Sequence, residues 1–139
     1  MKEIRWRLHL AAAPEDVWRL LATDAGRSRF WAESTTERDG AIEFVFANGQ
    51  RYTGRVLASD VPRTFELDYF GTPARFTLEG DGEGGTDLAL VQQVEDEWHV
   101  EVNAGWVSVL MALKAAADHG VDLRNHDARR TWSQGYCES

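Results

Sequence analysis

The chain has 139 residues and a formal net charge of −8. Nucleic-acid binding depends largely on Lys and Arg side chains that neutralise phosphates, so this charge argues against a nucleic-acid partner and against an anionic membrane surface. The length predicts one domain with a real core. A single cysteine, Cys137, excludes an internal disulfide, and the charged N-terminal segment lacks a signal-peptide pattern. We therefore expect a cytoplasmic protein.

Residues 4–10 alternate apolar and polar side chains, which is typical of a strand with one wet face. A short amphipathic helix is expected to follow, because Pro14 suits a first helical turn and acidic residues come directly after it. Gly26 is expected to end or break this helix. A second short helix is expected within residues 27–34, before the chain returns to strands.

The middle of the chain contains a series of strand candidates separated by turn residues. Asp39-Gly40 and Asn48-Gly49 are strong turn pairs. Apolar and polar side chains alternate between them and beyond. Short strands at regular spacing predict an antiparallel meander. The candidates are residues 41–47, 51–60, 63–70, 74–80 and 86–94.

Residues 102–117 show the longest helical pattern, with one apolar stripe over about four turns. Gly120 suits the left-handed position that follows a helix. The only partner large enough for this stripe is the sheet. We therefore expect an α+β helix-grip fold, in which a curved antiparallel sheet of about six or seven strands wraps around a long C-terminal helix. Residues 1–120 form the expected domain, and residues 121–139 an irregular C-terminal tail with Trp132 and Tyr136 as anchors.

Three stretches, "APEDVWRLLATDAGRSRFWAE", "GRVLASDVPRTFELDY" and "GWVSVLMALKAAADHG", resemble the START-like (SRPBCC) superfamily. Within it they look most like homologues of the activator of the heat-shock-protein-90 ATPase. The similarity covers roughly residues 4–120 and consists of spread-out structural positions. The matching positions are Pro14, Val17, Trp18, Trp31, Gly54, Pro62, Arg63, Gly105, Trp106 and Leu113.

The resemblance implies an internal apolar cavity, in a superfamily whose members bind lipids, polyketides or hormones, or act as cyclases. The residues agree with a cavity between sheet and helix, because many aromatic side chains share the inward phase. Gln92 has the same parity as Leu88 and Leu90, so its amide should face inward. Apolar walls with a few polar groups are typical of small-molecule sites. The predicted ligand-binding residues are Trp31, Phe44, Phe46, Phe65, Tyr69, Phe76, Gln92, Trp106, Leu110 and Leu113.

The sequence patterns for a catalytic or metal site are weaker than those for a ligand cavity. Cys137 lies near the C-terminal end of the sequence, where a surface thiol is the simpler interpretation. His119 and His126 lie near several Asp residues, but their spacing matches no helical metal motif. We predict no catalytic residue, no metal and no cofactor.

Three functions remain open. The first is non-catalytic binding of a hydrophobic or aromatic small molecule in the cavity, oriented by Tyr69 and Gln92. The second is a cyclase or hydrolase in the same cavity, which would need Glu33, Glu43 or Asp68 turned inward and desolvated. The third is a co-chaperone-like protein-interaction module, with a chaperone among the conceivable partners.

Overall fold

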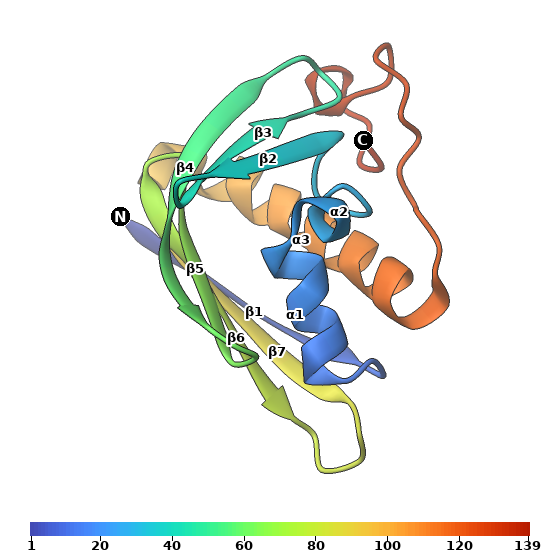
Figure 1. The fold of residues 1–139 in the computed structure, drawn as a ribbon. Coiled ribbons are helices and arrows are strands. Elements are labelled where there is room, and N and C mark those ends of the chain that lie inside the picture. Colours follow the sequence, from blue (N-terminus) through green and yellow to red (C-terminus); the bar gives the residue numbers. More distant parts are fainter.

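The computed structural model describes residues 1–139, and its strands form one antiparallel sheet (Figure 1). The strand order is β1-β7-β6-β5-β4-β3-β2, so only β1 lies out of sequence order, beside β7. This arrangement confirms the predicted meander and gives seven strands. Their bounds are β1 Lys2–Leu10, β2 Ser34–Arg38, β3 Ala41–Val45, β4 Arg51–Asp60, β5 Thr64–Tyr69, β6 Thr72–Gly80 and β7 Thr86–Val94.

The sheet bends sharply along β4. An added Cβ on Gly54 would lie 1.9 Å from the carbonyl oxygen of Asp68 on β5, so only glycine allows the two backbones to approach this closely. Two residues further along β4, the pairing with β5 shifts register between Val56 and Ala58. A bulge of this kind increases the bend of a strand. The sheet therefore curves into the concave surface that holds the core.

Three α-helices and two short 3₁₀ turns complete the chain. Gly26, expected to end the first helix, lies instead inside the second. The second helix covers Asp24–Arg27, so the helix predicted within residues 27–34 is wrong beyond Arg27. The reason is packing: a Cβ on Gly26 would lie 2.3 Å from the carbonyl oxygen of Arg19, so the glycine lets the two helices touch. The helical bounds are α1 Pro14–Ala22, α2 Asp24–Arg27, η1 Asp96–Trp98, α3 His99–His119 and η2 Trp132–Gln134.

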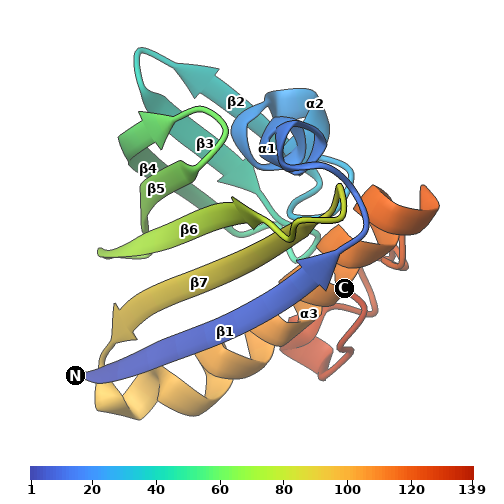
Figure 2. The same ribbon diagram turned by 90° about the horizontal axis from the view of Figure 1, so that it is seen from below.

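The long helix α3 runs along the β1 side of the sheet and closes the core (Figure 2). Trp106, Leu110 and Leu113 are buried, and Gly120 has the predicted left-handed conformation, with φ +63°. The helix-grip layout predicted from the sequence is thus confirmed. Near its C-terminal end, the Asp118 carboxylate accepts hydrogen bonds from the backbone N–H groups of Ala11 and Ala12, which ties α3 to the end of β1.

The opposite side of α3 is also apolar. Val100, Val107 and Met111 are 78%, 41% and 49% exposed. As a result, residues 96–119 are long and apolar enough, by length and composition, to cross a membrane, a test that the core helix of a soluble protein also passes. The expectation from the sequence, that no stretch approaches the roughly 20 apolar residues of a membrane helix, is wrong for this helix by these two criteria. In this fold the buried half of the helix packs against the sheet.

The segment after α3 is irregular apart from η2 and folds back along the helix (Figure 1). The Arg124 guanidinium donates hydrogen bonds of 2.7 Å to the carbonyl oxygens of both Ala32 and Ser28. Trp132 packs against Phe46, with ring centroids 5.8 Å apart. Trp132 is therefore an anchor of the tail, whereas Tyr136, the other expected anchor, is 39% exposed.

Candidate functional site

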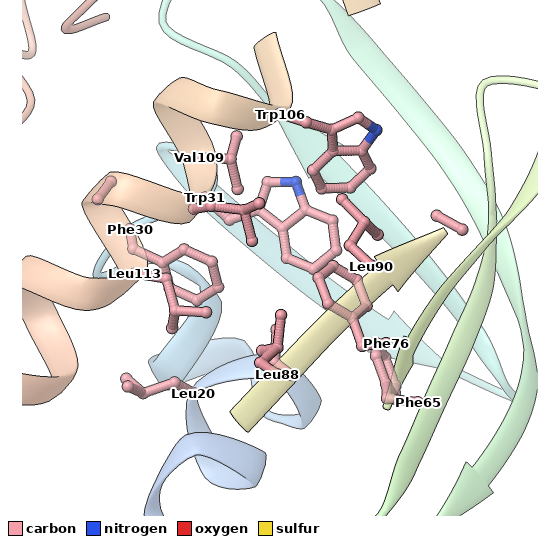
Figure 3. Close-up of a cluster of buried hydrophobic side chains, with 14 of the residues drawn as sticks. Leu20, Phe30, Trp31, Phe65, Phe76, Leu88, Leu90, Trp106, Val109 and Leu113 are labelled. Carbon is pink, nitrogen blue, oxygen red and sulfur yellow. The ribbon is translucent and has the colours of Figure 1, made fainter. Parts of the chain in front are cut away.

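The space between the sheet and α3 holds a cluster of aromatic side chains centred on Trp31 (Figure 3). The ring centroid of Trp31 lies 5.0 Å from that of Phe44, 5.6 Å from that of Phe76 and 5.9 Å from that of Trp106. The ring centroid of Tyr69 lies 5.5 Å from that of Trp31. These are contact distances for aromatic pairs. The rings of this cluster therefore fill the space by touching one another.

The polar groups of the cluster satisfy one another. The Gln92 side-chain oxygen accepts a 2.7 Å hydrogen bond from the indole N–H of Trp106, and its amide donates to the Tyr69 carbonyl and the Thr72 hydroxyl. The Trp31 indole donates to the Tyr69 hydroxyl at 3.1 Å. Burial raises the pKa of Tyr69, so its hydroxyl stays neutral. The buried Gln92 amide thus has protein partners and requires no ligand.

All ten predicted ligand-binding residues lie in this core, and Tyr69 alone retains partial exposure. Nine have exposed fractions of 4% or less. Their predicted ligand contact stays a prediction, because each also has an ordinary packing role. The nine are Trp31, Phe44, Phe46, Phe65, Phe76, Gln92, Trp106, Leu110 and Leu113.

An apolar pocket of about 310 Å³ lies between α3 and the tail. Trp31 belongs both to the inner cluster and to the lining of this pocket. The α3 part of the wall includes the outward residues Val107 and Met111. The full lining is Phe30, Trp31, Val107, Ser108, Val109, Met111, Ala112, Leu123, Arg124, Trp132, Cys137, Glu138 and Ser139.

A charged cluster attaches the tail to the rest of the domain. The His126 ring lies between two carboxylates, with Nδ1 2.8 Å from Glu33 and Nε2 2.8 Å from Asp122. These hydrogen bonds raise the pKa of His126. Burial tends to raise the pKa of Asp122, but hydrogen bonds from Arg124 and His126 outweigh it and lower that pKa to about 2. The cluster links the tail to the loop that carries Trp31.

A second pocket, of about 500 Å³, lies between α1, α2 and the C-terminal part of α3. Asp16, Arg19 and Arg29 bring charged side chains to its wall, and none of the aromatic cluster residues reaches it. The Arg29 guanidinium donates to the Ala116 carbonyl there. Its chemistry suits a hydrated surface better than an apolar ligand.

The carboxylates considered for acid–base catalysis lie away from the aromatic cluster. Glu43 pairs with Arg51 on the outer face and is 48% exposed. Asp68 accepts a 2.6 Å hydrogen bond from the Tyr52 hydroxyl, and Glu33 contacts His126. Among the His, Cys, Asp and Glu side chains, no group of three or more has the arrangement of a metal site. Cys137 is exposed as a residue.

Solved structures from several bacteria share this fold. The Aha1 dimer from Colwellia psychrerythraea is 25% identical, with a TM-score of 0.77 over 86% of this chain and 98% of that one. An AHSA1-like protein from Aeromonas hydrophila is 16% identical, with a TM-score of 0.72 over 85% and 96%. The protein SSP2350 from Staphylococcus saprophyticus is 21% identical, with a TM-score of 0.77 over 88% and 96%. The chain has an Aha1-like START (SRPBCC) fold. No family model and no curated protein matches its sequence.

We call the pocket between α3 and the tail the tail-covered pocket. In this Aha1-like START fold, its lining residues other than Trp31 are those that the sequence interpretation missed. Met111 and Val107 lie outside the buried stripe of α3. Leu123, Arg124 and Ser139 belong to no helical or strand pattern of apolar side chains. Trp132 was the single signal, noted as an anchor. Because the tail and the loop after α2 are about 100 residues apart in sequence, no local pattern could have brought them together.

Proposed function

We propose that this chain is a non-catalytic binding module for a hydrophobic or aromatic small molecule. The observation that carries the proposal is the apolar pocket between α3 and the tail, with Trp31 of the aromatic cluster in its wall. Its volume of about 310 Å³ is in the range of small-molecule sites, and its lining is mostly apolar with a few polar groups.

The ligand would lie between the outward residues of α3 and the tail, against the edge of Trp31. Covering the partly exposed side chains of Val107 and Met111 would favour binding, because apolar burial contributes roughly 25 cal/mol per Å². The methionine thioether adapts to irregular aromatic shapes.

This position differs from the one expected from the sequence, which placed the ligand between the sheet and residues 102–117. The inner aromatic rings already contact one another, and Gln92 already has partners. Close-packed interiors admit a ligand only by rearranging. The inner residues then act as the rigid support of the Trp31 wall.

The test is titration with N-phenyl-1-naphthylamine, a neutral probe that fluoresces in apolar sites. The critical variant is Met111→Glu, which places a carboxylate in the pocket wall at a position exposed enough to tolerate it. The matched control is Val100→Glu, on the same helix but outside the pocket. We expect saturable binding that Met111→Glu weakens roughly tenfold or more and Val100→Glu leaves unchanged, because a buried unpaired charge is costly.

Unchanged affinity in folded Met111→Glu would refute the pocket as the site. The co-chaperone-like alternative is supported by the similarity to the Aha1 dimer of Colwellia psychrerythraea. It would become the better proposal if no apolar probe bound, and a cyclase or hydrolase would require a carboxylate that the pocket wall supplies only at Glu138.

A further inference from the structure

Two residues that line the tail-covered pocket each have a buried polar atom without a hydrogen-bond partner. These atoms are the indole Nε1 of Trp132 and the hydroxyl oxygen of Ser139. Ser139 as a residue is only 8% exposed. Buried polar groups in folded proteins nearly always have a hydrogen-bond partner. Two unsatisfied groups on residues of one pocket therefore point to a partner that binds there.

Three other tryptophans contrast with Trp132, because each donates its indole N–H to a side chain. Trp106 donates its indole N–H to Gln92, and Trp31 donates to Tyr69. Even Trp6, at the surface, donates to Asn103 at 2.7 Å. The Trp132 indole can only donate, so what it lacks is an acceptor. The Ser139 hydroxyl can donate to the same kind of group.

The charges around the pocket decide against an anionic ligand. The Arg124 guanidinium already donates to Asp122 and to the Ser28 and Ala32 carbonyls, so its charge is paired with the Asp122 carboxylate. Glu138 adds a carboxylate to the lining. The chain as a whole carries a net charge of −8. A ligand carboxylate would meet like charge here without a free cation to pair with.

We propose that the ligand is a neutral, mostly apolar or aromatic molecule with a carbonyl-type acceptor, which receives hydrogen bonds from Trp132 and Ser139. This inference rests on the proposed function, because it assigns the ligand class of the same pocket. The apolar body lies against Met111, Val107 and Trp31, and the carbonyl oxygen faces the tail. The apolar wall supplies affinity, and the two tail donors distinguish a carbonyl compound from a plain hydrocarbon.

The experiment compares 2-acetylnaphthalene with 2-ethylnaphthalene, which have nearly the same shape and differ in the carbonyl oxygen. We expect the protein to bind the ketone roughly three- to tenfold more tightly, the range of one or two neutral hydrogen bonds. Trp132→Phe should remove most of this preference, which is measured as the ratio of the two affinities within the variant. In ¹H–¹⁵N spectra, the Trp132 indole proton should shift downfield with the ketone and much less with the hydrocarbon.

The outcomes separate the two levels of the proposal. Equal affinity for the two probes, or a ketone preference that survives in Trp132→Phe, overturns the ligand class and leaves the proposed function standing. Binding of neither probe overturns both. If Trp132→Phe does not fold, Ser139→Ala and the indole shift in the unchanged protein decide, since a preference without an indole shift also overturns the assignment.

Discussion

The two sides of α3 are both apolar but are completed differently. On the sheet side, Trp106 packs against other rings and its indole is bonded to Gln92. On the tail side, Val107 and Met111 stay partly exposed and the Trp132 indole has no partner. The sheet side is close-packed and its polar groups are paired, whereas the tail side is partly exposed and leaves one indole N–H unpaired. This difference is the basis of our proposal that the sheet side stabilises the fold and the tail side binds a ligand.

The largest expected effect comes from disrupting the aromatic core on the sheet side of α3. Trp31→Ala removes the side chain at the centre of the aromatic cluster, which is 1% exposed. Replacing a buried tryptophan by alanine costs about 3–5 kcal/mol, because burial is lost and a cavity remains. Urea unfolding should measure a loss of this size. A loss below 1 kcal/mol would show that the cluster does not hold the core.

A matched pair of substitutions sharpens the comparison. Trp106→Phe and Trp132→Phe both remove an indole N–H, but only Trp106 has a partner, Gln92, which would be left with an unpaired buried oxygen. An unsatisfied buried acceptor costs about 1–3 kcal/mol. Urea unfolding should therefore show Trp106→Phe to be more destabilising than Trp132→Phe by about that amount. Equal losses would remove the distinction between the two sides.

The smallest expected effect concerns the attachment of the tail. The pKa of His126 is raised by Asp122 and Glu33, so its contribution is complete below the unfolded value of about 6.5 and is lost as pH rises through the folded pKa. The pKa of Asp122 is lowered to about 2, so its contribution is present above its unfolded value and is lost as pH falls toward about 2. His126 is 39% exposed, so the effect should stay below about 1 kcal/mol.

Hydrogen exchange of the tail amides measures this directly. After correction for intrinsic exchange, protection of residues 122–134 should fall between pH 5.5 and pH 8.5. His126→Asn is the control, because it removes the imidazole and tolerates the left-handed backbone at this position, with φ +53°. The variant should show little pH dependence over the same range. Identical pH profiles for the two proteins would exclude the His126 cluster as the attachment.

Much of the fold could be predicted because it rests on local periodicity. Alternation in β1 separated its apolar side from its polar side, and even Trp6, which is 39% exposed, donates from the apolar side to Asn103 of α3. The buried stripe of α3 and the left-handed Gly120 were equally visible. Gly26 shows the limit, because a glycine that ends a helix and one that lets two helices touch look alike in sequence.

The candidate site was only partly predictable. The inward phase of the aromatic residues was correct, but no pattern shows whether a group of rings fills a space or lines one. Arg27 illustrates a related failure: it is fully buried, with its guanidinium bonded to Thr35, Asp24 and the Leu21 carbonyl, and no local feature distinguishes it from a surface arginine. The tail-covered pocket depends on contacts across most of the chain.

The most direct test of this account is a ¹H–¹⁵N titration with 2-acetylnaphthalene that follows the indole signals of Trp132 and Trp106 together. Each signal is assigned by its loss in the corresponding Phe variant. Binding between α3 and the tail predicts a large shift for Trp132 and little change for Trp106, whose bond to Gln92 stays intact. A large shift of Trp106 with Trp132 unmoved would place the ligand between sheet and helix and contradict the account.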